Sequence, residues 1–269
     1  MTVEDVAADC ETVDAEVGAR GDRVATITLR RPDARNALNA QLRAELADVI
    51  DAVGGNEVRA VVLTGAEEAG AFAAGADVTE LRERDALEQR EASKRPRVYE
   101  HVADCPMPVI ARINGHALGG GCELIQACDV RIAHEDAKIG QPEITLGIMP
   151  GGGGTQRLPR LVGEGQAMRL ILSGELIDAA EAQEIGLVDE VHTDDDFDDA
   201  VNDLAASIAS NSPVALEFAK QSVQAASQMG LEDGIEYEAE LFAQLFATHD
   251  KDEGIDAFLE DRDPEWRGE

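Results

Sequence analysis

The stretch Val109-Ile-Ala-Arg-Ile-Asn-Gly-His-Ala-Leu-Gly-Gly-Gly-Cys-Glu-Leu124 contains the elements of an α/β fold in miniature. Residues 109–113 are mostly apolar and predict a buried strand. The glycines that follow predict a turn, and a short helix is expected to continue to Cys128. This order of strand, glycine-rich turn and helix is typical of an α/β domain that carries its sites on the turns.

The same order recurs on both sides of this stretch. Apolar patterns predict strands at 24–29, 58–63 and 129–133, and an amphipathic helix at 39–53 with Asn39 as its N-cap. Residues 65–76 and 138–154 are rich in glycine, which predicts loops. Residues 77–99 are polar, and we expect them to form mobile helical structure.

No strand is expected after Asp195, where apolar stripes predict helices that begin near Phe197, Pro213, Leu231 and Asp252. We therefore divide the chain into a core of residues 1–195, which carries the active site, and a helical oligomerisation region of residues 196–269. The apolar faces of the second region must be covered by a neighbouring subunit or by the core, and we expect a subunit interface.

The charge balance is unusual, with 55 acidic and 23 basic residues and a net charge of −32. The acids are spread through periodic sequence, which argues against a disordered tail or one docking surface for a basic partner. The composition is typical of a halophilic protein, because in molar salt the Debye length falls to about 3 Å and self-repulsion is screened. We expect no nucleic-acid partner, since no basic surface is visible.

The remaining composition predicts a cytoplasmic protein without membrane contact. Its N-terminus lacks the order of a signal peptide, and no apolar run approaches the ~20 residues of a membrane helix. The four cysteines form no CxxC pair, and no His/Cys cluster has zinc spacing. We expect buried thiols and no metal.

The glycines at 119–121 allow a ligand to approach the backbone and expose N–H groups at a helix start. A phosphate loop is disfavoured because the GK[ST] of a P-loop and the spacing G-x-G-x-x-G are both missing. An oxyanion site for a polarised carbonyl fits better. Tight packing of strand against helix explains the same glycines equally well.

Two carboxylates lie on separate glycine-rich segments. Glu123 is near the start of the predicted helix, where it could also merely complement the helix dipole. Glu143 follows a proline among mostly apolar neighbours, where an acid is costly unless it is partnered or functional. Such a pair suits acid/base work on a water or a carbon acid. A third segment, 71–77, could supply another N–H, or be an ordinary small-residue turn.

Taken together, these segments resemble the crotonase (enoyl-CoA hydratase/isomerase) superfamily from about Val24 to Phe258. The matching motifs are Arg31-Pro32 with Asn36-Ala-Leu38, Phe72-Ala-Ala-Gly-Ala-Asp77, Asn114-Gly115 with Gly119-Gly-Gly-Cys-Glu123, Gln141-Pro-Glu143 through Pro150-Gly151 to Gln156-Arg-Leu158, Ser173-Gly174 with Gly186-Leu-Val188, and Phe246 through Gly254.

The resemblance implies an α/β crotonase spiral of ββα units, followed by a helical region that forms a homotrimer or a hexamer made of two trimers. The substrate would be an acyl-CoA, so no separate cofactor is expected. Its thioester oxygen would bind the N–H groups of Ala76 and Gly120. Glu123 and Glu143 would hold one water, with a contact from Gly151, for syn addition to a trans-2-enoyl-CoA.

The same resemblance implies contacts to CoA from six residues: Arg35, Ala37, Ala74, Asp77, Phe242 and Arg262. Asp33 and Asp261 are departures, because relatives commonly carry lysines there. The basic residues within 82–97 are candidate replacement contacts for the phosphates; a solvated helix face is the alternative reading of them.

Both glutamates together favour an enoyl-CoA hydratase, as used in fatty-acid β-oxidation and related pathways, since isomerases of the family typically lack one of them. An isomerase or another acyl-CoA transformation is the first alternative, and product analysis with a 3-enoyl-CoA separates the two. A non-catalytic acyl-CoA-binding protein is the second alternative, which tight binding without turnover would favour.

Overall fold

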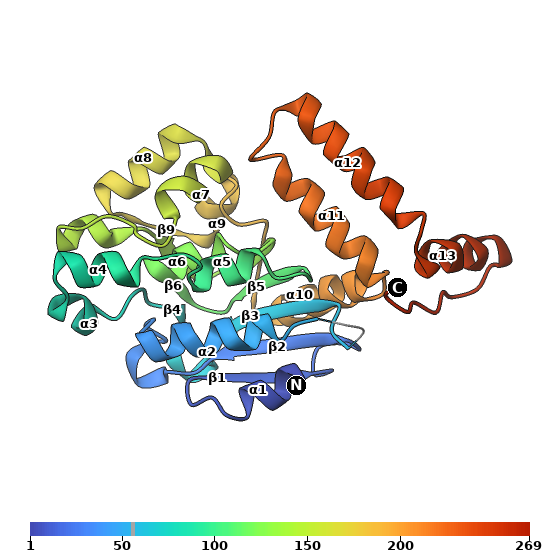
Figure 1. The fold of residues 1–269 in the computed structure, drawn as a ribbon. Coiled ribbons are helices and arrows are strands. Elements are labelled where there is room, and N and C mark those ends of the chain that lie inside the picture. Colours follow the sequence, from blue (N-terminus) through green and yellow to red (C-terminus); the bar gives the residue numbers. More distant parts are fainter. Residues whose placement is uncertain (55–56) are drawn as a thin grey trace.

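Two β-sheets form the centre of the computed structural model, which describes residues 1–54 and 57–269 (Figure 1). The larger sheet has the strand order β1 (Val13–Val17), β2 (Val24–Leu29), β3 (Ala60–Gly65), β5 (Val109–Ile113), β7 (Val130–His134) and β10 (Glu190–His192). The smaller sheet has the order β4 (Ala71–Ala73), β6 (His116–Leu118), β8 (Lys138–Gly140) and β9 (Leu176–Asp178).

From β3 to β8, successive strands alternate between the two sheets, which makes this part of the chain a spiral. Each of β3, β5 and β7 in the larger sheet is followed along the chain by β4, β6 and β8 in the smaller one. These strands pair in parallel within each sheet, with Leu63 opposite Ala111 and Ala117 opposite Ile139, whereas β9 joins β8 antiparallel. The sequence predicted an α/β spiral of ββα units, and the topology confirms it.

The helices cover the sheets and extend beyond them. Their bounds are α1 (Val3–Ala7), α2 (Ala40–Asp51), α3 (Val78–Glu83), α4 (Ala86–Ala92), α5 (Val98–Ala103), α6 (Gly120–Ile125), α7 (Gly154–Val162), α8 (Glu164–Ser173), α9 (Ala179–Glu184), α10 (Asp194–Ala209), α11 (Pro213–Ala225), α12 (Leu231–Leu245) and α13 (His249–Glu260). Short 3₁₀ turns lie at Pro32–Ala34, Glu67–Ala69 and Pro142–Leu146.

The larger sheet is buried on both faces, as is usual for parallel strands. Every residue of β3 is buried; Val61 and Leu63 contribute to the main core, whereas Ala60 and Val62 contribute to a second cluster. α10 closes this second cluster with Phe197 and three other apolar residues. The mostly apolar strand sequences follow from this two-sided burial.

Several predicted elements are confirmed and others need correction. The strands at 24–29 and 109–113 have the expected bounds, and Asn39 caps α2 by accepting the Leu42 N–H at 2.9 Å. The two expected loops were partly wrong, because they contain the short strands β4 and β8. The helix expected to reach Cys128 ends at Ile125.

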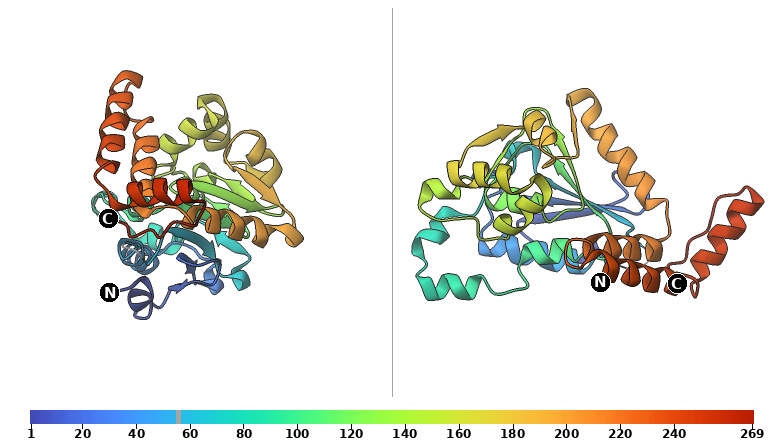
Figure 2. Two further views of the ribbon diagram at one scale, coloured as in Figure 1. Left: turned by 90° about the vertical axis from the view of Figure 1, so that its right-hand side faces the viewer. Right: turned by 90° about the horizontal axis from the view of Figure 1, so that it is seen from above.

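The last three helices project to one side of the body, as Figures 1 and 2 show. The expectation that no strand follows Asp195 is confirmed for the described residues. These helices leave large apolar side chains open, including Leu231, which is 80% exposed, and Phe258, which is 85% exposed. The division of the chain at residue 195 stays a prediction. None of the described helices is long and apolar enough to cross a bilayer.

Candidate active site

A cavity of about 880 Å³ lies where α5, α6, the segment between β4 and α3, and residues 142–152 meet. Its wall contains the five residues to which the sequence analysis gave chemical roles: Ala76, Gly120, Glu123, Glu143 and Gly151. They come from three separate chain segments, so only the fold brings them together.

Glu123 lies on α6, whose six residues are all buried, and is itself 3% exposed. Its Oε1 accepts the N–H of Gly152 at 2.6 Å and the N–H of Gly154 at 2.8 Å. Burial raises the pKa of Glu123, while these backbone bonds and the nearby cations Arg97 and Arg157 oppose the rise. Oε2 has no hydrogen-bond partner among the described residues.

Glu143 reaches the same cavity from the 3₁₀ turn at Pro142–Leu146 and is only partly buried. Burial raises its pKa to about 7, and the negative charge of Glu123 contributes in the same direction. With its amide nitrogen turned toward Glu143, the buried Gln141 donates to both carboxylate oxygens, at 2.9 and 3.2 Å. A carboxyl of this pKa exchanges its proton near neutrality.

The two predicted oxyanion donors approach each other across the turns. A Cβ placed on Gly120 would lie 3.3 Å from the Ala76 nitrogen, and one on Gly75 would lie 3.8 Å from the Gly120 nitrogen. Gly75 and Gly119 have positive φ angles of 108° and 51°, which place the backbone for this approach. Within residues 1–54 and 57–269, the N–H groups of Ala76 and Gly120 bond to no protein acceptor, so both are open to a ligand oxygen.

Gly151 begins the glycine turn that leads into α7. Its carbonyl accepts a hydrogen bond from Arg97 Nη1, while its N–H meets no acceptor in the described chain. An exposed N–H in the cavity wall, next to the Gly152 amide that binds Glu123, is suitably placed to contact a water.

Sequence reasoning assigned no role to three other residues at this site. Tyr99 lines the cavity, and its hydroxyl would lie 3.0 Å from a Cβ on Gly120. Glu100 is buried beneath the cavity, and Arg157 approaches it from α7. The available signal was the Arg97-x-x-Glu100 spacing at the start of α5, which places two opposite charges on one turn.

The predicted CoA contacts fall into two groups. Arg35, Ala37, Ala74 and Asp77 lie together, since Ala74 N donates to Arg35 O at 3.0 Å and Arg31 reaches both Asp77, at 3.1 Å, and the Ala37 carbonyl. Of the six, only Ala74 belongs to the cavity wall formed by the described residues; Phe242 on α12 and Arg262 after α13 are outside it, as are the other three. Their contact with CoA stays a prediction.

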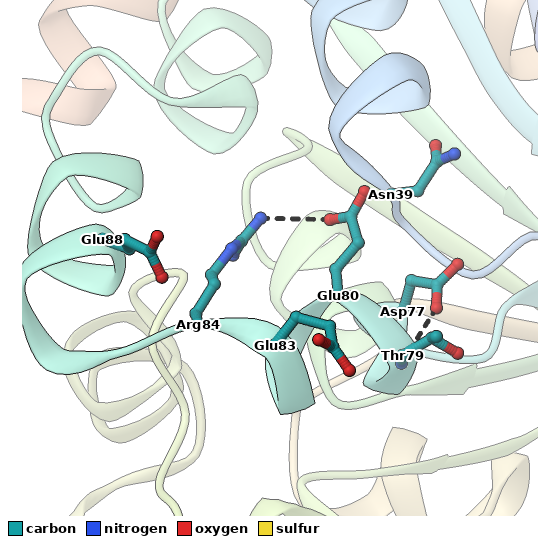
Figure 3. A pocket seen from close by; sticks show the side chains of 7 residues that line it. All are labelled: Asn39, Asp77, Thr79, Glu80, Glu83, Arg84 and Glu88. Atoms are coloured by element: carbon teal, nitrogen blue, oxygen red, sulfur yellow. Dashed lines mark hydrogen bonds and ion pairs between the residues drawn. The ribbon is translucent and has the colours of Figure 1, made fainter.

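A second hollow of about 770 Å³ lies along α3 and the start of α4, and Figure 3 shows its side chains. Arg84 also lines the first cavity, and it pairs with Glu80 at 3.1 Å. Most of the lining is acidic, which disfavours a polyanionic ligand. The residues are Asn39, Asp77, Thr79, Glu80, Glu83, Arg84 and Glu88.

None of the four cysteines is among the residues that line the cavity. Cys105, Cys122 and Cys128 are buried free thiols and Cys10 is partly buried, in line with the predicted buried thiols. Among the described residues, no group of three or more His, Cys, Asp and Glu side chains could hold a metal ion.

Comparison with known proteins places this geometry in a family context. Residues 19–269 match the family described as enoyl-CoA hydratase/isomerase. A 2,3-dehydroadipyl-CoA hydratase of Escherichia coli is 45% identical over 93% of this chain and 97% of its own length. A short-chain-enoyl-CoA hydratase of Clostridium acetobutylicum is 43% identical over 89% of this chain and 92% of its own. The crystal structure of an enoyl-CoA hydratase from Bacillus anthracis superposes with a TM-score of 0.89 at 40% identity, over 96% of this chain and all of that one.

Proposed function

The chain belongs to the enoyl-CoA hydratase/isomerase family, and on that basis we propose that it catalyses syn addition of water to a trans-2-enoyl-CoA, giving a 3-hydroxyacyl-CoA reversibly. The observation that carries the proposal is the meeting of Glu123, Glu143 and two open backbone donors in one cavity. The similarity to enzymes named as hydratases over most of the chain supports the same reaction.

The environments of the two glutamates suggest a division of roles. Glu123 is held by two N–H groups through Oε1, which leaves Oε2 to accept a proton from the attacking water. Glu143, with a pKa of about 7, donates its proton to the α-carbon. The water oxygen bonds to the β-carbon, and the proton held by Glu123 then returns through solvent to Glu143.

The N–H groups of Ala76 and Gly120 take the thioester oxygen in this proposal. Negative charge that develops on that oxygen during attack is stabilised by donors already in place, and one such donor is typically worth ~10²–10³ in rate. The Gly151 N–H contacts the water.

Binding of CoA and assembly complete the proposal. Arg35 is exposed and forms no ion pair within the described residues, so it is free to meet a CoA phosphate, alongside Ala37, Ala74 and Asp77. The open apolar side chains of α12 and α13 favour a homotrimer or a dimer of trimers, in which Phe242 and Arg262 of one subunit approach the CoA of another. We place the enzyme in the cytoplasm of a halophile, in β-oxidation of short- or medium-chain acyl groups.

Product analysis in ¹⁸O-labelled water tests the reaction. The protein is incubated with crotonyl-CoA and, separately, with trans-3-hexenoyl-CoA, and the products are analysed by mass spectrometry. A hydratase gives 3-hydroxybutyryl-CoA with one oxygen from water. Conversion of the 3-enoyl substrate without hydration of crotonyl-CoA would instead identify an isomerase, and tight binding with no product would identify a binding protein.

A further inference from the structure

A buried ion cluster lies directly behind the glycine turn that holds Glu123. Glu100, which is 4% exposed, accepts from Arg97 Nη2 at 2.8 Å and from Arg97 Nε at 3.0 Å. Arg157 Nη2 lies 3.8 Å from the same carboxylate. Burial acts to raise the pKa of Glu100, but the hydrogen bonds from Arg97 outweigh it and the pKa is lowered. The cluster therefore stays charged near neutrality.

Both arginines also bind the turn itself. Arg97 Nη1 donates to the Gly151 carbonyl, and Arg157 Nη1 donates to the Gly152 carbonyl at 3.0 Å. These are successive carbonyls of the segment whose Gly152 and Gly154 N–H groups bind Glu123 Oε1. Each arginine thus connects Glu100 to the backbone that orients Glu123.

The turn cannot fix its own conformation, because residues 151–154 are all glycine and lack side chains that could pack. A side chain at 152 or 153 would also meet close contacts, although a Cβ on Gly151 meets nothing within 4 Å. A Cβ on Gly152 would lie 2.6 Å from Glu123 Oε2, and one on Gly153 would lie 2.4 Å from Arg157 Nη1. Contacts from outside must therefore hold the turn.

We propose that Arg97, Glu100 and Arg157 form a positioning clamp, which holds the Gly151–Gly154 turn so that Glu123 and the Gly151 N–H both face the reacting water. This inference rests on the proposed hydratase function, because it concerns the same site. Glu100 and Arg157 are outside the cavity wall formed by the described residues, whereas Arg97 lines the cavity. In this proposal all three act through the turn and through the charge that they place near Glu123.

The charges around Glu123 decide whether a substitution in the clamp raises or lowers the pKa of this residue. Arg97 and Arg157 favour its ionised form, whereas burial and the nearby Glu143 carboxylate disfavour it. Burial raises the pKa of Tyr99, so this neighbour stays neutral. Loss of one arginine raises the pKa of Glu123. Loss of the Glu100 charge leaves Arg97 and Arg157 uncompensated, together with the exposed Arg95, whose Nε lies 3.5 Å from Glu100. It therefore lowers the pKa of Glu123.

Three variants and one control test the clamp: Arg157→Gln, Arg157→Lys and Glu100→Gln, with Arg160→Gln as the control. Arg160 is an exposed residue on the same helix and, within the described part of the chain, donates only to the Gln156 carbonyl. The readouts are kcat and KM for crotonyl-CoA across pH, and hydrogen–deuterium exchange of the peptide 151–158.

We expect Arg157→Gln to lower kcat by about 10²-fold with little change in KM, because the base is displaced. The acidic limb of its pH–kcat profile moves to higher pH, because the pKa of Glu123 rises. The amide hydrogens of the peptide 151–158 exchange faster. Arg157→Lys keeps the acidic limb near the wild-type pH but still lowers kcat, since lysine lacks the planar fork that places one nitrogen at the Gly152 carbonyl and a second near Glu100. Glu100→Gln moves the limb the opposite way, to lower pH, which a purely structural defect would not do.

Unchanged kcat and an unchanged acidic limb in Arg157→Gln, with or without faster exchange, would overturn the clamp. Shifts of the same sign in Arg157→Gln and Glu100→Gln would overturn it as well. If the wild-type protein hydrates nothing, the proposed function fails. Hydrogen–deuterium exchange of the peptide and titration of Glu123 by ¹³C NMR then still decide whether the clamp exists.

Discussion

The Gly152 N–H donates to Glu123 Oε1 at 2.6 Å, so the carboxylate on α6 is oriented by the turn that leads into α7. Gly154 donates to the same oxygen at 2.8 Å. Because the base and its anchor come from two segments, the orientation of Glu123 depends on backbone outside its own helix.

Gly152→Ala should abolish most activity while leaving the sheets intact. A Cβ at this position would lie 2.4 Å from the Tyr99 ring and 2.6 Å from Glu123 Oε2, so the turn must shift. We expect kcat to fall by about 10²-fold or more. Gly165→Ala is the matched control, because a Cβ on Gly165 in α8 meets nothing within 4 Å. Equal kinetics for the two variants would contradict the assigned role of the turn.

The raised pKa of Glu143 predicts a pH-dependent effect of Glu143→Gln on stability. The folded-state pKa of Glu143, about 7, lies above the ordinary value of 4.5. Ionisation of this residue therefore lowers the free energy of unfolding of the wild-type protein as the pH rises from about 4.5 to about 7. The glutamine variant, which never ionises, should be more stable than wild type at pH 8 by up to about 3 kcal/mol, with a much smaller difference at pH 5. Urea unfolding at both pH values measures this, and a difference that is larger at pH 5 would disprove it.

The apolar side chains of α13 predict that Phe258→Asp weakens assembly. Phe258 is 85% exposed in the single chain, and burial of an aromatic side chain stabilises an interface while a carboxylate there is costly. Light scattering in molar KCl should show a trimer or hexamer for wild type and smaller species for the variant. A monomeric wild-type protein would refute the oligomer proposal, and Arg160→Gln serves as the surface control.

The net charge of −32 predicts that salt stabilises the fold. At low ionic strength the acidic surface repels itself, whereas at about 1 M salt the Debye length is about 3 Å and the repulsion is screened. The melting temperature should therefore rise between about 0.1 M and about 2 M KCl. A melting temperature that is constant or falls over this range would contradict adaptation to salt.

The chemistry-bearing segments were predictable because their residue types are unusual. Glycines beside Glu123 and a proline before Glu143 indicated sites on turns, and the structure places both acids in one cavity. Helix α2 was predictable as well, since its apolar spacing and its Asn39 cap are both local signals.

Other features depended on contacts distant in sequence. The strands β4 and β8 are three residues long, too short to show a period, and they form because parallel neighbours pair with them. Nothing near Arg157 indicates that its guanidinium meets the Gly152 carbonyl and the buried Glu100, because that meeting requires α5 and α7 to be packed. The pKa of Glu143 likewise depends on burial that only the fold supplies.

The most direct test of the two-glutamate mechanism is the loss of the conjugated enoyl-thioester absorbance of crotonyl-CoA in molar KCl. Wild type is compared with Glu123→Gln, Glu143→Gln and the exposed α8 control Glu164→Gln. We predict turnover by wild type and the control, and losses of about 10²–10⁴-fold for each active-site variant. Wild-type protein that is folded and binds CoA but leaves the absorbance unchanged, or full activity in either the Glu123→Gln or the Glu143→Gln variant, would contradict the account.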